Sequence, residues 1–287
     1  MTNIPSSTLN SGMSMPMIAY GLGGVTMSRT HEDVAASISA AIKSGYYHID
    51  AAEAYGNEAV LGDAINDSNL SRETLFITTK VLGTPGQDIE VACDASLQKL
   101  KIDYVDLYLI HLPHLAPDEI VSMWKTMEKI QISGRARSIG VSNFVQRHLE
   151  KILAVASITP AVNQIEYHPY LQHGDLVQFY QKAGITVSAY GTLTAITKAA
   201  PGPVDDVYTS LAQKYSVTRG DIAMRWCIEQ DIAVVMTSSS EERLQRVAQK
   251  LWSFRLAGDE VDELSRLSQQ KHYHVLYNKW FAGDDRS

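Results

Sequence analysis

The feature that most constrains the fold is the alternation of short apolar runs with helical patterns along most of the 287 residues. The apolar runs predict strands at 18–22, 46–50, 75–79, 105–110, 136–141, 161–164, 185–189 and 233–236. The segments between them predict helices at 32–43, 58–65, 89–100, 120–132, 144–155, 176–182, 207–215, 222–229 and 241–250. Such alternation implies a parallel sheet, and eight units at this length imply a closed (β/α)₈ barrel.

Three segments lie outside this repeat. Asn10-Ser11-Gly12 predicts the turn of a small hairpin before the first strand. Residues 194–204 contain Gly202 and two prolines and are expected to form a loop, and an extra helix and a tail are expected at the C-terminus. Because no segment has the composition of a linker, residues 1–287 are expected to form one domain.

The alternative fold is an open doubly wound sheet, which would require a glycine-rich nucleotide turn after the first strand. The stretch GLGG at 21–24 is the candidate for that turn, but the motif needs a third glycine where Thr26 stands. The pattern therefore favours the barrel, with a tight turn here that brings the backbone close to another group.

Composition restricts the class of protein. The formal net charge is −7 without long runs of like charge, which argues against nucleic acid or an anionic membrane as a partner. No apolar run reaches the roughly 18 residues of a membrane span, and the first basic residue, Arg29, comes too late for a signal peptide. Cys93 and Cys227 have no metal or redox spacing, so we expect a soluble cytoplasmic protein with reduced thiols.

Polar residues stand where the predicted strands end. They are Asp50, with Tyr55 just beyond it, then Lys80, His111, Ser142-Asn143, Gln164 and Tyr190. Each alone has a structural explanation, such as a turn cap, a core tyrosine or a solvated strand end. In a parallel barrel, however, these ends meet at one mouth, which is where active sites of this fold lie.

The chain resembles the aldo-keto reductases over essentially its whole length. Five motifs in order carry the resemblance: HIDAAEAYGNE at 48–58, FITTK at 76–80, LYLIH at 107–111, GVSNF at 140–144 and VNQIEYHPYL at 162–171. Three details are most similar to the fungal conjugated-polyketone and ketoamide reductases. These are the Ala-Glu pair after Ala51, Thr-Ser-Ser at 237–239 and LYNKW at 276–280.

The resemblance implies hydride transfer from NADPH to an aldehyde or ketone, with Asp50, Tyr55, Lys80 and His111 as catalytic residues. Tyr55 would donate a proton to the oxygen as it becomes an alkoxide. A free phenol has a pKa near 10, so Lys80 is expected to lower that pKa while Asp50 holds Lys80 in place. His111 would hydrogen-bond the carbonyl oxygen. This chemistry needs no metal, and the histidines have no ligand spacing.

The resemblance also implies the cofactor contacts. Ser142, Asn143 and Gln164 would bind the nicotinamide carboxamide, and Tyr190 would stack on the ring. The remaining expected contacts are Gly23, Gly24, Gly191, Leu193, Thr237, Ser238, Ser239, Ser240 and Arg243. Ser238, Ser240 and Arg243 at a helix N-terminus suit a 2′-phosphate, which favours NADPH over NADH. Thr237 stands where the family commonly has a lysine, and Arg246 is a candidate to replace that charge.

The substrate pocket is expected to involve Val25, Ala54, Leu82 and Leu112, where relatives often carry aromatic residues. Small aliphatic side chains there would leave a wide apolar cavity, which predicts a bulky apolar ketone as substrate. The tail carries Tyr273, Tyr277, Trp280 and Phe281. These aromatics either close over the substrate or pack the tail against the barrel, and the sequence does not decide between the two.

Two alternative functions remain. The same site could reduce an imine or a secondary-metabolite intermediate, or the chain could be a non-catalytic NADP-binding regulatory subunit. The complete set of four catalytic residues argues against the second. A monomer is expected, with a dimer as the alternative.

Overall fold

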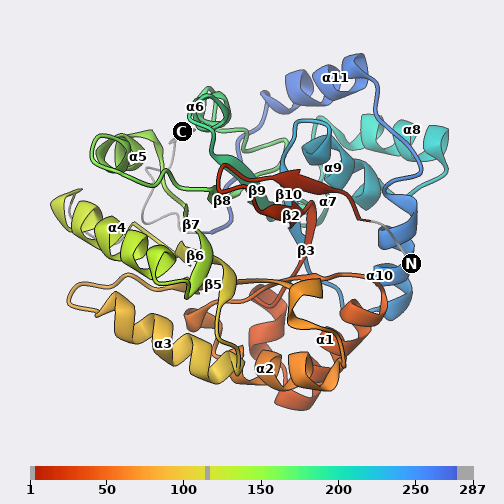
Figure 1. The fold of residues 1–287 in the computed structure, drawn as a ribbon. Coiled ribbons are helices and arrows are strands. Elements are labelled where there is room, and N and C mark those ends of the chain that lie inside the picture. Colours follow the sequence, from red (N-terminus) through yellow and green to blue (C-terminus); the bar gives the residue numbers. More distant parts are fainter. Residues whose placement is uncertain (1–3, 114–116, 277–287) are drawn as a thin grey trace.

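The computed structural model describes residues 4–113 and 117–276 and confirms the barrel (Figure 1). Its eight parallel strands close in the order β10-β3-β4-β5-β6-β7-β8-β9. They are β3 (Ile18–Gly21), β4 (His48–Asp50), β5 (Phe76–Val81), β6 (Val105–Ile110), β7 (Ala136–Ser142), β8 (Val162–Glu166), β9 (Thr186–Tyr190) and β10 (Ala233–Met236). Each strand end differs from the prediction by at most two residues.

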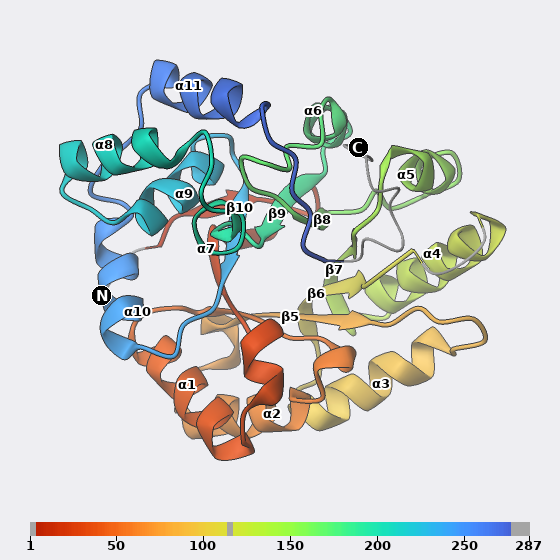
Figure 2. The same ribbon diagram turned by 180° about the vertical axis from the view of Figure 1, so that it is seen from behind.

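Helices surround this barrel (Figures 1 and 2). They are α1 (His31–Lys43), α2 (Glu58–Asp67), α3 (Ile89–Leu100), α4 (Pro117–Ile132), α5 (Gln146–Leu153), α6 (Leu176–Lys182), α7 (Thr194–Thr197), α8 (Asp205–Tyr215), α9 (Arg219–Ile228), α10 (Glu241–Lys250) and α11 (Gly258–Ser268). Short 3₁₀ turns are η1 (Gly24–Ser28), η2 (Glu53–Tyr55) and η3 (Arg72–Thr74). The extra C-terminal helix is α11. The sequence missed α7 because one helical turn is too short to show a hydrophobic period.

Local side-chain contacts explain where several helices begin. Asp88 accepts the N–H groups of Glu90 and Val91 at the start of α3. Thr218 accepts the N–H of Asp221 at the start of α9, while the Asp221 carboxylate accepts the N–H of Thr218 in return. These bonds satisfy backbone donors that have no partner inside the helix. No helix within residues 4–113 and 117–276 is long and apolar enough to cross a membrane.

The predicted N-terminal hairpin forms and covers the amino-terminal end of the barrel. Strands β1 (Ser6–Thr8) and β2 (Ser14–Pro16) pair antiparallel around the turn at Asn10. The Asn10 amide donates 3.0 Å hydrogen bonds to the carbonyls of Pro160 and Gly184, which lie just before β8 and β9. The hairpin therefore closes one end of the barrel and leaves the opposite end for a site.

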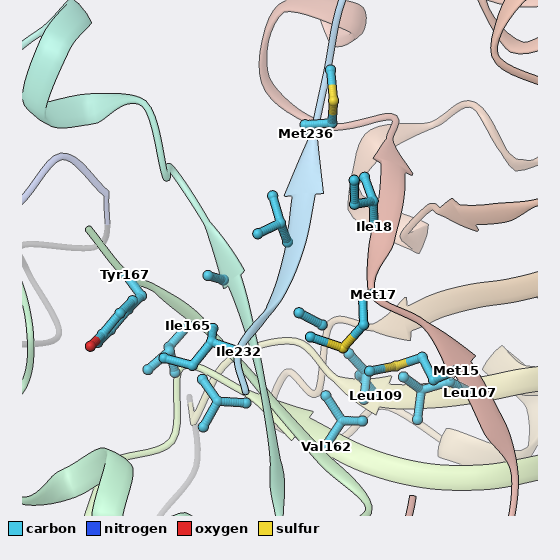
Figure 3. Close-up of a cluster of buried hydrophobic side chains, with 14 of the residues drawn as sticks. Met15, Met17, Ile18, Leu107, Leu109, Val162, Ile165, Tyr167, Ile232 and Met236 are labelled. Atoms are coloured by element: carbon cyan, nitrogen blue, oxygen red, sulfur yellow. The ribbon is translucent and has the colours of Figure 1, made fainter. Parts of the chain in front are cut away.

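Apolar side chains fill the barrel below that open end. Met15 of the hairpin, Ile18 of β3, Leu109 of β6 and Val162 of β8 lie at 0% exposure and pack together (Figure 3). Burying each such side chain stabilises the fold by about 1.5–3 kcal/mol. Because apolar side chains fill this part of the barrel, we expect a polar site only at the carboxyl ends of the strands.

One histidine is buried in the fold as a neutral group. His48 of β4 is 3% exposed, with Nδ1 3.2 Å from the Pro16 carbonyl and Nε2 2.9 Å from the Thr78 hydroxyl. Burial is the main cause that lowers the pKa of His48 from 6.5 to about 4, although the Asp50 charge opposes the shift. The folded protein therefore resists protonation at this position.

This predicts acid sensitivity centred on His48. As the pH falls from 6.5 to about 4, the unfolded chain gains a proton at His48 that the folded protein does not bind. The free energy of unfolding should fall by about 3 kcal/mol over this window from His48 alone. Urea unfolding of His48→Gln between pH 6.5 and 4 should show a fall in the free energy of unfolding that is smaller than in the native protein by about 3 kcal/mol. Ser37→Ala, a buried polar change without titration, should lower stability equally at each pH. An unchanged pH dependence in His48→Gln would contradict the assignment.

Candidate active site

A cavity of about 290 Å³ opens at the carboxyl ends of the barrel strands. Three of the predicted catalytic residues, Asp50, Tyr55 and His111, line it, and Lys80 lies beneath them. Predicted cofactor residues share the same lining: Gly23, Gly24, Ser142, Gln164, Tyr190, Gly191, Leu193 and Thr237. Residues that are far apart in sequence therefore meet at one mouth, as expected for strand ends of a barrel.

The centre of the site is a buried ion pair. Lys80 of β5 is 0% exposed, and its Nζ donates to Asp50 Oδ1 at 2.6 Å and to the Ala51 carbonyl at 2.9 Å. The same ammonium lies 3.5 Å from the Tyr55 hydroxyl. The His111 ring meets the Tyr55 ring edge-on, with 5.6 Å between centroids. The four side chains therefore form one contact group around the Tyr55 phenol.

The electrostatics of Tyr55 differ from the prediction. We expected Lys80 to lower the pKa of Tyr55, but burial, and then the Asp50 charge, raise the pKa of this phenol above 10. Asp50 pairs directly with Lys80 and offsets the positive charge that the ammonium would present to the phenol. Tyr55 consequently carries its proton throughout the neutral range, as a proton donor must.

The predicted carboxamide ligands are joined to the ion pair by hydrogen bonds. Gln164 Nε2 donates to Asp50 Oδ2 at 2.8 Å, and the Ser142 hydroxyl donates to the Gln164 carbonyl at 2.8 Å. Asn143 donates to the Ser142 hydroxyl and to the His111 carbonyl, both at 3.0 Å. Tyr190 donates to Asn143 Oδ1 at 2.6 Å. These residues form one network and fix one another's orientation.

Asn143 has a left-handed backbone conformation. Its φ is +63°, in the left-handed region, and the residue is 3% exposed. A residue other than glycine in this region costs about 1–3 kcal/mol unless its surroundings hold it. The bonds to Ser142, His111 and Tyr190 supply that support.

The turn at Gly23 is where backbone comes close to the site. A Cβ atom built on Gly23 would lie 2.8 Å from Tyr55 Cζ and 3.0 Å from its hydroxyl oxygen. A side chain at this position would therefore displace the phenol, which explains the glycine. Gly24 follows with a φ of +64°. The backbone of Val25 belongs to η1, and its side chain lies outside the described part of the structure.

The junction of β10 and α10 contains the predicted adenosine contacts. The Thr237 hydroxyl donates to the Gly21 carbonyl at 2.6 Å, and Ser238 is buried at 4% exposure. Ser240 caps α10 by accepting the N–H of Arg243, while the Ser239 and Arg243 side chains are exposed. Exposed donors at a helix N-terminus suit an anion.

Arg246 was a candidate to replace the lysine charge that Thr237 lacks, but its guanidinium is not free to bind a phosphate. Its guanidinium pairs with the carboxylate of Asp221, which is 0% exposed. A charge that already neutralises a buried carboxylate is not available to a phosphate without leaving that carboxylate unpaired. Arg243 remains the cation of this segment.

Three of the four predicted substrate residues, Ala54, Leu82 and Leu112, have described side chains. Ala54 and Leu82 are partly buried, and Leu112 is 6% exposed next to His111. Among the described residues, these three are not part of the lining of the 290 Å³ cavity. Tyr273 packs partly buried against the core. Tyr277, Trp280 and Phe281 lie outside the described residues.

Further residues that the sequence analysis did not predict also line the cavity, and four of them bear on its chemistry. Glu166 ends β8 two residues beyond Gln164, so strand alternation places both side chains on the same face and could have revealed it. Lys198 follows α7, in the stretch predicted as a loop. Val275 and Leu276 come from the segment after α11, whose path the sequence pattern does not predict. Throughout the described part of the chain, no cluster of His, Cys, Asp or Glu could hold a metal ion.

Comparisons with known proteins agree with this geometry. Residues 18–269 match the family model described as "Aldo/keto reductase family". An NAD/NADP-dependent indole-3-acetaldehyde reductase of Schizosaccharomyces pombe is 37% identical over 270 residues, covering 91% of this chain and 94% of its own. An aldo-keto reductase of Mycobacterium bovis is 39% identical over 267 residues, covering 92% and 91%. The crystal structure of a Bombyx mori aldo-keto reductase in complex with NADP has a TM-score of 0.86 and 32% identity, covering 98% and 97%.

The buried ion pair predicts that a substitution of nearly equal size at Asp50 strongly destabilises the protein. Asp50→Asn removes the carboxylate charge and leaves the Lys80 ammonium buried without a counter-ion, which should lower the free energy of unfolding by about 3–5 kcal/mol. Urea unfolding at neutral pH measures this loss. Asp63→Asn is the matched control, because Asp63 pairs with Lys101 at the surface and exposed pairs contribute at most about 1 kcal/mol. Equal losses in both variants would contradict the role of Asp50.

Proposed function

Because the chain belongs to the aldo/keto reductase family, whose members are oxidoreductases of the carbonyl/alcohol couple, we propose that it uses NADPH to reduce an aldehyde or ketone, with Tyr55 as the proton donor. The observation that carries this proposal is the position of the Tyr55 hydroxyl. It lies in a cavity, 3.5 Å from a fully buried Lys80 ammonium, with His111 beside it. A protonated phenol next to a cation can give up its proton and have the resulting anion stabilised.

The residues present fit a nicotinamide cofactor. Ser142 and Gln164 line the cavity, Gln164 donates to the catalytic Asp50, and Ser142 donates to the Gln164 backbone carbonyl, so they can hold a carboxamide close to Tyr55. Gly23 and Gly191 line the cavity without side chains, which leaves room for a ligand beside them. Lys198 lines the same cavity and offers a positive charge for the phosphates. A bound cofactor would supply the hydride.

The chain's own residues perform the proton transfer. His111 donates a hydrogen bond to the substrate oxygen and orients the carbonyl group towards Tyr55. When the carbonyl carbon accepts a hydride, the oxygen gains negative charge, and the Tyr55 O–H gives its proton to that oxygen. Lys80 then stabilises the phenolate from 3.5 Å until solvent returns a proton. Asp50 keeps Lys80 in place through their 2.6 Å contact.

Preference for NADPH over NADH rests on Arg243. Its exposed guanidinium is at the first turn of α10, beside Ser239 and Ser240, where the helix dipole also favours an anion. The 2′-phosphate of NADPH would bind here. Thr237 contributes a hydroxyl instead of a charge, so Arg243 supplies most of the attraction.

We propose a bulky apolar ketone as the substrate. The described wall includes Met236, Val275 and Leu276, which suit an apolar substituent. Val25, Ala54, Leu82 and Leu112 remain proposed contacts for its far end. The resemblance to the fungal conjugated-polyketone and ketoamide reductases supports this choice. We further propose a cytoplasmic location, supported by Cys93 and Cys227, which are buried free thiols, and we propose that the protein is a monomer.

Tyr55→Phe tests the proton donor. Deleting the hydroxyl should lower kcat by about 10²–10⁴-fold, because general acid catalysis contributes roughly that factor. NADPH consumption against a panel of aldehydes and ketones measures the loss. Tyr208→Phe, which deletes a buried hydroxyl without a hydrogen-bond partner among the described residues, is the control and should retain activity. Tight NADPH binding without turnover of any carbonyl by the native protein would instead support a regulatory subunit.

Arg243→Ala tests the choice of cofactor. Losing a charged hydrogen bond of about 1.5–3 kcal/mol should weaken NADPH binding by roughly 10- to 150-fold and leave NADH binding nearly unchanged. Fluorescence titration with both cofactors gives the two dissociation constants. Lys250→Ala, at the opposite end of the same helix, should affect neither. Equal weakening of both cofactors in Arg243→Ala would refute the 2′-phosphate site.

A further inference from the structure

A single buried carboxylate joins the barrel to the segment that follows α11. Glu166 is the last residue of β8 and is 2% exposed. Its Oε1 accepts the N–H of Val275 at 3.0 Å, and its Oε2 accepts the N–H of Leu276 at 3.0 Å. Figure 2 shows this segment running from α11 towards the ends of β7 and β8. Residues 272–276 are called the strap below.

Two imidazoles complete the surroundings of this carboxylate. His168 Nε2 lies 3.1 Å from Oε1, and His274 Nε2 lies 3.4 Å from Oε2. Burial alone would raise the pKa of Glu166, but the hydrogen bonds from His168 and from the strap amides outweigh it and lower the pKa. Glu166 is therefore ionised at neutral pH and needs these donors, because a buried charge without partners is costly.

The strap also forms part of the cavity wall. Glu166, Val275 and Leu276 line the same cavity as Tyr55 and His111. Glu166 pairs in register with Tyr190, the residue proposed to stack on the nicotinamide ring. Leu276 leaves 43% of its surface exposed. An apolar ligand group would cover it.

We propose that Glu166 is a positioning residue that fixes the strap against the mouth of the cavity, so that Val275 and Leu276 form the wall which recognises the apolar part of the substrate. This inference rests on the proposed carbonyl reduction and specifies what selects the substrate. The strap has no helix or strand to hold it. Its anchors include the Glu166 bonds, the packing of Tyr273 against the core and a 3.1 Å bond from the Tyr273 N–H to the Tyr170 carbonyl.

Glu166→Gln is the direct test. The carboxylate accepts three N–H contacts from the strap, since Oε2 also accepts the Val275 N–H at 3.2 Å. The amide keeps the size of the side chain, but it has one accepting oxygen and no charge, so it loses the contact at the other end and weakens the rest. The KM for a ketone with a bulky apolar substituent should rise about tenfold more than the KM for a small aldehyde, a difference of about 1.4 kcal/mol. Hydrogen exchange at the Val275 and Leu276 amides should accelerate in the same variant.

Glu128→Gln is the matched control. Glu128 is also a buried glutamate that accepts two successive backbone N–H groups, those of Ser157 and Ile158 at 2.6 and 2.9 Å, but it does not line the cavity. This variant should leave the ratio of the two KM values and the strap amides as in the native protein. If Glu166→Gln does not fold, Glu166→Asp replaces it, since the shorter carboxylate cannot reach both amides.

A double-mutant cycle with Leu276→Ala separates positioning from direct contact. If Glu166 acts through the strap, Leu276→Ala should raise the KM for the bulky ketone in the native background and change it little in Glu166→Gln. Additive effects, or unchanged exchange at the strap amides, would overturn the inference. If the native protein reduces no carbonyl compound at all, the proposed function fails instead, and the exchange measurement still reports on the strap.

Discussion

The site depends on an ammonium and a carboxylate that the barrel removes from water. Lys80 and Asp50 lie on adjacent strands, with 0% and 2% of their side chains exposed. Burying either charge without its partner would cost several kcal/mol, so the pairing holds both side chains in place. The remaining oxygen of Asp50 accepts from Gln164, which brings β8 into the same arrangement. Strand packing, the proton-transfer group and the proposed nicotinamide pocket are thereby coupled through one ion pair.

The same principle recurs at Glu166, two residues beyond Gln164 and on the same face of β8. There a buried carboxylate is satisfied by backbone amides and imidazoles instead of by a lysine. In the proposed function, Asp50 orders the proton-transfer group and Glu166 orders the wall beside it. Both are carboxylates at strand ends, where the barrel no longer supplies backbone partners and side chains must provide them.

Sequence reasoning succeeded where the signal is periodic or local. The strands, the long helices and the hairpin at Asn10 were predicted to within a few residues, because each depends on apolar spacing or on turn residues within the element. It failed for α7, which is a single turn, and for the pKa of Tyr55. The shift of Tyr55 is decided by burial and by the distance between Asp50 and Lys80, which no spacing along the chain encodes.

The sequence by itself determined that eight strands would bring Asp50, Tyr55, Lys80 and His111 to one mouth, since parallel strand ends converge in a closed barrel. The tertiary structure alone decided which groups share hydrogen bonds there. Gln164 turned out to bind Asp50, Arg246 to be committed to Asp221, and Glu166 to hold a segment more than a hundred residues away. Such pairings depend on distances across the folded molecule, which spacing along the chain does not give. A buried charge must have a partner, and the fold decides which partner lies within reach.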